Sequence, residues 1–227
     1  MHIRIDFIEQ LANQIAALEG RVVVAIDGVD GSGKTTFADE LALLVINANR
    51  SVVRASVDGF HNPKATRYRR GKSDPEGFFL DSYNYDSLHR FLLDPFRSGA
   101  DLVDVARYDH AIDEEISKPK SVEPSAVLLL DGIFLHRDEL QGQWDFSIFL
   151  SVPFSVSYAR MAIRDGSKPD PLAPENRRYH QGQLLYLQTC KPEDRATIVI
   201  DNSVIEAPKL VQRSAGARIN FQQFPPT

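Results

Sequence analysis

The sequence predicts an α/β fold with a mostly parallel sheet, because short apolar runs alternate with amphipathic segments along the chain. Residues 21–27 and 126–132 are almost continuously apolar, as strands covered on both faces are. Residues 36–48, which follow the first run after a glycine-rich turn, carry apolar side chains at helical spacing. Strand, turn and helix in this order predict a doubly wound sheet with right-handed crossovers.

The remaining elements follow from the same two patterns and predict one domain over residues 1–227. Apolar runs predict further strands at 51–57, 101–108, 146–152 and 197–201. Helical spacing predicts helices at 6–19, 83–96, 153–165 and from residue 177 onward. The basic residues 62–81 and the proline-rich residues 166–178 lack this periodicity, so we expect both to be insertions in a core over about 21–201. We expect the polar tail at 214–227 to fray.

Composition excludes several classes of protein. The 227-residue chain has a net charge of −5 and no long basic run, which argues against non-specific binding to nucleic acid or to a membrane. Its single cysteine, Cys190, excludes an intrachain disulfide and a cysteine-based zinc site, and we expect an inert thiol. No apolar run approaches the roughly 18 residues of a membrane span, and we find no signal peptide, so we expect a cytoplasmic protein. The sequence leaves open whether the chain forms a homo-oligomer.

Residues 28–35 read Gly-Val-Asp-Gly-Ser-Gly-Lys-Thr and fit the phosphate-binding pattern G-x-x-x-x-G-K-[ST]. Glycines let the backbone curl so that successive N–H groups face one anion, and the following helix directs its positive end at the same phosphates. Lys34 supplies a mobile charge for the β- and γ-phosphates, and the Thr35 hydroxyl is a hard oxygen ligand for Mg²⁺. The residues expected to bind ATP are Gly28, Asp30, Gly31, Ser32, Gly33, Lys34, Thr35 and Thr36.

Two aspartates stand at the carboxyl ends of predicted strands, where ligands of open α/β sheets bind. Asp58 follows the strand at 51–57 and could accept a hydroxyl proton or hold Mg²⁺ through water. An Asx turn explains the Asp-Gly pair at 58–59 equally well. Asp131 ends a continuous apolar strand and has the form of a Walker B carboxylate, which orients Mg²⁺ beside Thr35.

Several stretches together resemble the uridine kinase and phosphoribulokinase branch of P-loop kinases, over roughly residues 21–201. The specific matches are Ser-Val-Asp-Gly-Phe-His at 56–61, Arg-Tyr-Asp at 107–109, Leu-Asp-Gly-Ile-Phe at 130–134 and Ala-Arg-Met-Ala-Ile-Arg-Asp at 159–165. The resemblance implies a three-layer P-loop NTPase fold with a helical lid. It also implies a kinase that uses ATP and Mg²⁺ to phosphorylate a hydroxyl of a small molecule.

The same resemblance implies a role for each matching residue. Asp58 takes the place of the base that deprotonates the ribose 5′-hydroxyl in uridine kinases, and Asp81 that of a ribose-binding carboxylate. Tyr108 falls where a tyrosine contacts the nucleobase, and lid arginines neutralise the transferring phosphate. The expected catalytic residues are Asp58, Lys34 and Arg164, with Arg160 in the ATP site and His61, Asp81, Tyr108 and Arg177 in the acceptor site.

Departures from the family pattern leave the acceptor open. His61 stands where the family usually has tyrosine, Asp131 where it has glutamate, and a proline-rich lid replaces a lid rich in glycine and arginine. A nucleoside such as uridine or cytidine is the preferred acceptor, and pantothenate or a sugar is the alternative. A third interpretation is a nucleotide-binding regulatory protein, against which Asp58 and the lid arginines argue, because a sensor needs no base.

Overall fold

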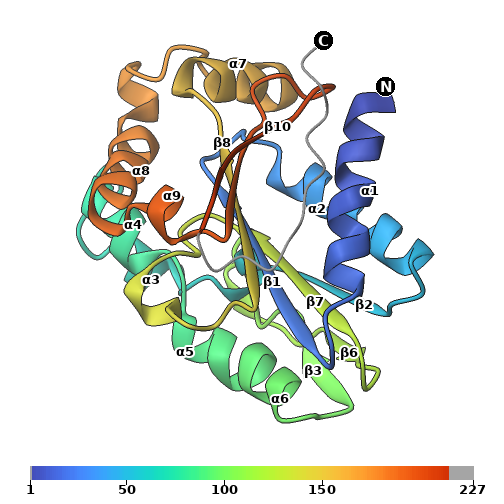
Figure 1. Ribbon diagram of the computed structural model, residues 1–227. Coiled ribbons are helices and arrows are strands. Elements are labelled where there is room, and N and C mark those ends of the chain that lie inside the picture. The colour runs from blue at the N-terminus through green and yellow to red at the C-terminus, as the bar shows by residue number, and fades with distance from the viewer. Residues whose placement is uncertain (1, 215–227) are drawn as a thin grey trace.

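A six-stranded sheet organises residues 2–214, the part of the chain that the computed structural model describes (Figure 1). Its strands are β1 (Val22–Gly28), β2 (Val52–Ser56), β7 (Val127–Gly132), β8 (Phe146–Ser151), β9 (Ile198–Asp201) and β10 (Lys209–Arg213), in the spatial order β10-β9-β8-β1-β7-β2. Neighbouring strands are parallel except β9 and β10, which are antiparallel. The expected mostly parallel sheet is therefore confirmed, whereas β10 was not expected. The tail predicted to fray lies, from residue 215 onward, outside the described residues.

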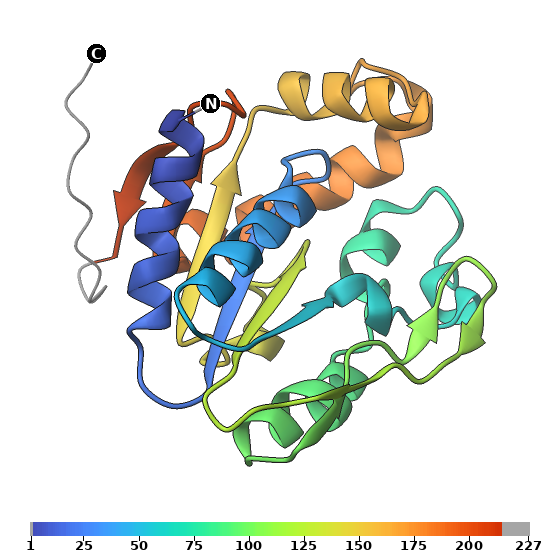
Figure 2. The same ribbon diagram turned by 90° about the vertical axis from the view of Figure 1, so that its right-hand side faces the viewer.

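Helices cover both faces of the sheet, which gives the three expected layers. One face carries α1 (His2–Ala16) and α2 (Lys34–Asn47), and the other carries α4 (Pro75–Asp81), α8 (Arg177–Cys190) and α9 (Pro192–Arg195) (Figure 1). Figure 2 looks onto the first face and shows α1 and α2 in front of the strands. Leu11 and Phe37 belong to the apolar core on this face, and Phe78 and Tyr186 belong to the core on the other. Within residues 2–214, no helix is long and apolar enough to span a bilayer.

The register of the strands brings their carboxyl ends to one edge of the sheet. Ile26 of β1 and Ser56 of β2 both lie opposite Asp131 of β7, and Gly28 lies opposite Leu150 of β8. Every residue of β1 and β7 is buried, because other strands flank them and helices cover both faces. The loops that leave β1, β2 and β7 therefore meet at the same edge.

Two predicted segments differ in detail from the structure. Residues 62–81, expected to be a loop, contain α3 (Lys64–Arg67) and α4. The Asp74 side chain caps α4 by accepting a hydrogen bond from the N–H of Gly77 at 2.6 Å, and Pro75 follows in the first turn. A capping aspartate followed by proline starts a helix even where apolar residues do not recur at helical spacing. The helix expected over 83–96 is divided into α5 (Tyr85–Leu88), a π-helical turn (His89–Leu93) and α6 (Asp94–Arg97), because Pro95 lacks the N–H that a continuous helix needs.

Short strands replace the single strand expected over 101–108. The structure has β3 (Leu102–Asp104), β4 (Tyr108–Asp109), β5 (Glu114–Glu115) and β6 (Pro119–Ser121), where β3 pairs with β6 and β4 with β5. Residues 111–125, for which no strand was predicted, supply β5 and β6. The helix expected over 153–165 is α7 (Phe154–Asp165), and it ends at Gly166, whose φ of 74° is left-handed. None of these short strands joins the central sheet.

Helices α4 and α8 approach closely at a glycine. A Cβ atom on Gly182 of α8 would lie 2.7 Å from a ring carbon of Phe78 and 2.8 Å from the carbonyl oxygen of Pro75. Both neighbours belong to α4, and the Pro75 carbonyl oxygen is backbone, which cannot move aside without shifting the helix. The spacing of the two helices therefore depends on the absence of a side chain at this position.

The first prediction tests this contact. Gly182→Val should lower the free energy of unfolding by about 2 kcal/mol, because overpacking a close helix contact forces the helices apart. Urea titration followed by circular dichroism measures the change. Gln188→Val places the same side chain on the exposed face of the same helix and controls for helix propensity. An equal loss in both variants would contradict the packing argument.

Candidate active site

The phosphate-binding loop leaves the end of β1 and becomes the first turn of α2. Gly31 and Gly33 have φ angles of 73° and 91°, in the left-handed region that favours glycine. A Cβ atom on Gly31 would collide with the carbonyl oxygen of Ser157 on α7. The Nζ of Lys34 donates to the carbonyl of Val29 at 2.9 Å, so this side chain lies back across the loop. The geometry is that of an anion cradle, as the sequence predicts.

A buried carboxylate anchors the start of this loop. Asp27 is 0% exposed, and its Oδ1 accepts the N–H of Gly28 at 2.7 Å. Its Oδ2 lies 2.7 Å from Nδ1 of His136 and also accepts a hydrogen bond from the Tyr186 hydroxyl. These contacts fix the loop to the β7–β8 connection and to α8. Sequence analysis treated Asp27 only as the end of a strand, although a carboxylate within an apolar run is itself a signal.

Thr35 and Asp131 lie together, as expected for ligands of Mg²⁺. The Thr35 hydroxyl donates to Oδ2 of Asp131 at 2.9 Å, and Arg54 of β2 donates to Oδ1 at 3.0 Å. Asp131 is only 2% exposed, so Arg54 both orients and neutralises it. The hydroxyl and carboxylate are hard oxygen donors, which fit Mg²⁺ bound to a nucleotide. The hydroxyl of Ser32 is buried and has no partner among residues 2–214, which also leaves a donor for phosphate.

Asp58 lies in the turn that follows β2. Its Oδ1 accepts a hydrogen bond from the Tyr83 hydroxyl at 2.9 Å. Burial and the nearby Asp58 raise the pKa of Tyr83 well above its usual value, so this phenol stays a donor at neutral pH. Nδ1 of His61 lies 2.9 Å from the Asp58 carbonyl oxygen, and burial lowers the pKa of His61. The sequence places Tyr83 only at the start of the helix predicted over 83–96, because only the fold brings it to Asp58.

A cavity of about 230 Å³ joins the phosphate-binding loop to Asp58. It is lined by Asp30, Gly31, Gly33, Lys34, Thr35, Thr36, Asp58, Tyr83, Asp131, Gly132, Ile133 and Arg164. All three residues expected to be catalytic therefore line one space. Arg164 is also paired with Asp165 at 2.7 Å and remains largely exposed. Burial raises the pKa of Asp30 although Lys34 opposes this effect.

A second cavity of about 430 Å³ lies beside the first. It is lined by His61, Pro63, Asn84, Asp86, Ser87, Arg90, Phe91, Arg107, Tyr108 and Glu115. The ring centroids of His61, which lines the second cavity, and Tyr83, which lines the first, are 4.6 Å apart. The two cavities are therefore neighbours. His61 also stacks on His110 at 4.4 Å, and the Tyr108 hydroxyl donates to Asp113 at 2.8 Å. Two of the four residues expected to bind the acceptor, His61 and Tyr108, therefore share a cavity next to Asp58.

Asp81 is the third of these residues, and it lines neither cavity. It is 4% exposed, and its carboxylate accepts hydrogen bonds from Arg69, at 2.5 Å to the nearer oxygen, and from Arg70 at 3.1 Å. These contacts attach the basic residues after α3 to the end of α4. The contact between Asp81 and an acceptor stays a prediction, and the observed contacts are those of a carboxylate that holds the 62–81 segment.

The remaining predicted arginines also lie outside both cavities. Arg177 is at the start of α8, where its Nε donates to Gln181 at 3.3 Å. Arg160 donates to the carbonyls of Asn202 and Ser203 at 2.8 and 2.9 Å. The Asn202 side-chain amide in turn donates to the Ser32 carbonyl at 2.7 Å, so Arg160 supports the phosphate-binding loop through Asn202. The predicted roles of Arg160 in ATP binding and of Arg177 in acceptor binding stay predictions.

The sequence analysis missed Arg178, the residue after Arg177. Its guanidinium is buried and donates to the carbonyls of Arg67, Gly71, Lys72 and Asp74, at 3.0 to 3.2 Å. It also lies 4.9 Å from the ring centroid of Tyr68. Arg178 therefore holds the 62–81 segment from α8. Adjacent arginines at the start of a helix give no sequence signal of which one is buried.

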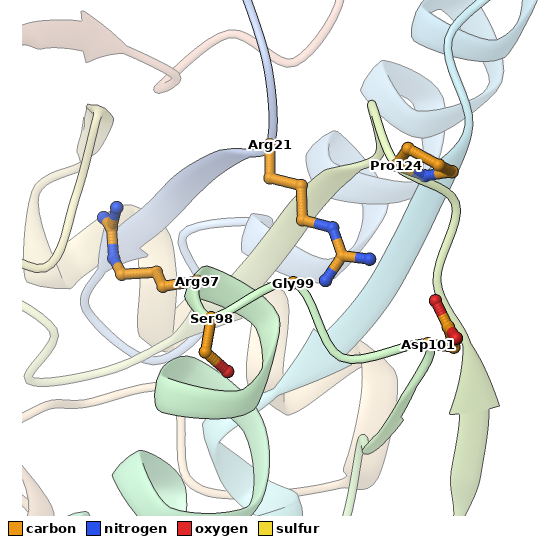
Figure 3. Close-up of a pocket in the computed structure, with 6 residues that line it drawn as sticks. All are labelled: Arg21, Arg97, Ser98, Gly99, Asp101 and Pro124. Carbon is orange, nitrogen blue, oxygen red and sulfur yellow. The ribbon is translucent and has the colours of Figure 1, made fainter.

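A third cavity, of about 410 Å³, lies near the amino end of β1, away from the phosphate-binding loop (Figure 3). Arg21 points into it, between the segment at 98–101 and Pro124. The Arg21 guanidinium already donates to the carbonyls of Phe96 and Ala100, at 2.9 and 2.8 Å. These contacts tie the end of α6 to the sheet, and we assign the cavity no chemistry.

Comparison with known proteins adds an independent observation. The family model described as Phosphoribulokinase / Uridine kinase family matches residues 23–168. The uridine kinase of Deinococcus deserti is 27% identical over 210 residues, which cover 86% of this chain and 95% of that enzyme. The pantothenate kinase of Limosilactobacillus reuteri is 31% identical over 114 residues, which cover 49% of this chain and only 36% of that enzyme.

A solved structure agrees with these sequence matches. The structure of a possible uridine kinase from Bacillus stearothermophilus superposes with a TM-score of 0.68 and 26% identity. The superposition covers 86% of this chain and 96% of that chain. It confirms the expected three-layer fold around a phosphate-binding loop.

The second prediction concerns Asp81. Burial opposes its ionisation, but the hydrogen bonds from Arg69 and Arg70 favour the charged form by more, so its pKa lies below the usual value. Such a carboxylate stabilises the fold above its unfolded pKa of about 3.9, and this stabilisation is lost as the pH falls through its folded pKa. Asp81→Asn should therefore lower the free energy of unfolding by about 2 kcal/mol at neutral pH.

Urea titrations at neutral pH and at about pH 3 measure this difference, which should shrink at the lower pH. Glu76→Gln is the control, because Glu76 is exposed and its contact with Arg70 is 3.4 Å. This variant should differ from the wild type by less than about 0.5 kcal/mol. A loss from Asp81→Asn that is the same at both pH values would contradict the assignment of the charge.

Proposed function

This chain belongs to the phosphoribulokinase and uridine kinase family, and we propose that it transfers the γ-phosphoryl group of ATP to a hydroxyl of a nucleoside. The expected enzyme class, an ATP-dependent small-molecule kinase, is confirmed by the family and by its uridine kinase relatives. The observation that carries the proposal is the cavity in which Lys34, Asp58 and Arg164 meet. A cation suited to the phosphates and a carboxylate suited to take a proton from an alcohol therefore line one small space.

The proposed mechanism assigns one task to each group. Backbone N–H groups of residues 31–36 and Lys34 bind the triphosphate. Thr35 and Asp131 would hold Mg²⁺, which neutralises charge on the phosphates when it is bound. Asp58 takes the proton from the acceptor hydroxyl as its oxygen bonds to the γ-phosphorus, and the bond from that phosphorus to the bridging oxygen of ADP breaks. Arg164 stabilises the charge that spreads over the transferring group.

The surroundings of Asp58 suit this task. Tyr83 donates to one carboxylate oxygen, which fixes the orientation of the carboxylate and leaves the other oxygen for the acceptor. Positioning and electrostatic stabilisation carry most of phosphoryl transfer, so a fixed base beside a rigid cradle is the main requirement. Asp58 and the phosphate-binding loop both follow strands of the central sheet, and the register of these strands sets their relative positions.

A nucleoside is the favoured acceptor because the relatives that this chain spans most fully are uridine kinases. The second cavity offers the aromatic side chains of Phe91 and Tyr108 and polar groups around them, which suit a base and its edges. The pantothenate kinase match favours pantothenate as the alternative, and a sugar is the other acceptor of this branch. A cytoplasmic location and a homo-oligomer stay predictions.

An acceptor panel tests the proposal. Purified protein is incubated with ATP and Mg²⁺ and with uridine, cytidine, pantothenate or a set of sugars, and ADP release is measured. We expect uridine or cytidine to raise ADP release at least tenfold over the acceptor-free rate. Stimulation by pantothenate or a sugar alone would move the assignment to that acceptor. ATP binding without stimulation by any acceptor would favour the regulatory protein instead.

The third prediction concerns the base. Asp58→Asn should lower kcat by about 100-fold or more, because general base catalysis contributes this much in typical enzymes. Binding of a non-hydrolysable ATP analogue, measured by calorimetry, should persist. Lys34→Ala is the contrast, since it should weaken binding of the analogue as well as abolish turnover. A rate for Asp58→Asn within twofold of the wild type would refute the role of Asp58.

A further inference from the structure

Asp30 is the residue of the phosphate-binding loop that phosphate binding does not explain. Its backbone N–H donates to Oε1 of Gln183 at 2.6 Å, so this N–H is directed at α8. Gln183 is only 1% exposed, which makes it a rigid anchor. The position of Asp30 is therefore set by the protein, before any ligand binds.

The carboxylate of Asp30 is left without a protein partner. Asp30 lines the 230 Å³ cavity together with Lys34 and Asp58. Within residues 2–214, no hydrogen bond or ion pair engages its side chain, although Lys34, Asp58 and Arg164 are its electrostatic neighbours. A half-buried carboxylate with free acceptor sites calls for a hydrogen-bond donor from a ligand.

The phosphate groups of the nucleotide cannot supply that donor. A triphosphate offers oxygens, so a carboxylate beside it gains nothing and is repelled. Mg²⁺ has its own carboxylate in Asp131, which already contacts Thr35. Asp81, the carboxylate that the resemblance assigns to the acceptor, is held by Arg69 and Arg70 and lines neither cavity. The acceptor, whose hydroxyl groups enter the same cavity in the proposed reaction, is a ligand that can supply a donor.

We infer that Asp30 is a specificity-determining residue that accepts a hydrogen bond from a second hydroxyl of the acceptor, beside the hydroxyl that Asp58 deprotonates. The inference rests on the proposed function and narrows its substrate class to polyhydroxylated acceptors, such as the ribose of a nucleoside or a sugar. Asp58 and Asp30 then divide two tasks within one cavity. One takes the proton of the reacting hydroxyl, and the other fixes the orientation of the molecule that carries it.

The experiment, which also provides the fourth prediction, compares the wild type with Asp30→Ala and Asp30→Asn. The acceptors are uridine and its 2′-deoxy and 3′-deoxy analogues, or, if a sugar proves to be the acceptor, that sugar and its mono-deoxy analogues. The wild type should lose about 10- to 100-fold in kcat/KM on one deoxy analogue, because a hydrogen bond to a charged group is removed. Asp30→Ala should lose a similar factor on the full acceptor and lose little more on that analogue.

Two further readouts separate this role from nucleotide binding and from misfolding. Binding of a non-hydrolysable ATP analogue to Asp30→Ala should be as tight as in the wild type or tighter, because a negative charge near the triphosphate is removed. Asp30→Asn keeps the shape of the side chain and should show a smaller loss of the same kind. Asp6→Asn removes an exposed carboxylate of α1 that lines neither cavity and should leave all constants unchanged.

The outcomes distinguish this inference from the proposed function. If the wild type phosphorylates an acceptor but the losses from Asp30→Ala and from deoxygenation multiply, Asp30 does not contact that hydroxyl. Weaker binding of the ATP analogue by both Asp30 variants would assign the residue to the nucleotide and would also overturn the inference. If the wild type phosphorylates no member of the panel, the proposed function fails first.

Discussion

The buried carboxylate of Asp27 is the interaction on which the site depends. A charge that is removed from water needs good partners, and Asp27 has the Gly28 N–H, His136 and Tyr186. These partners come from the phosphate-binding loop, the segment after β7, and α8. The loop therefore starts from a point that is fixed to three parts of the fold. A cradle of backbone N–H groups needs such a fixed start, because its atoms must converge on one anion.

Helix α8 extends this constraint to the 62–81 segment. Its buried face is unusually polar, and each of its three polar side chains serves a different segment. Arg178 holds the 62–81 segment, Gln183 holds Asp30, and Tyr186 holds Asp27. The proline-rich residues 166–176 lead directly from α7, which carries Arg164, into this helix. One helix thus connects residues 166–176, the phosphate-binding loop and the 62–81 segment, so their relative placement is a property of α8.

Sequence patterns predicted the part of the site that is local in the chain. The loop at 28–35, the carboxylate of Asp131 after an apolar run and Asp58 after the second strand each carry their own signal, and the parallel sheet brings them to one edge. Contacts between distant segments gave no such signal. The pair of Tyr83 and Asp58, and the burial of Arg178 rather than Arg177, depend on how helices pack against the sheet. The strand β10 is mostly exposed and pairs on one side only, so its pattern is weak.

The same division explains why the reaction is better defined than the acceptor. The groups proposed to act on ATP lie at the ends of β1, β2 and β7, whose register leaves them little freedom. The second cavity is instead lined from short elements, including α5, β4 and β5, which lie outside the central sheet. Such elements can change without disturbing the core. The departure from the family pattern at His61 falls in this region. Acceptor choice can therefore vary while the phosphoryl chemistry, held by the sheet edge and by Asp27, stays the same.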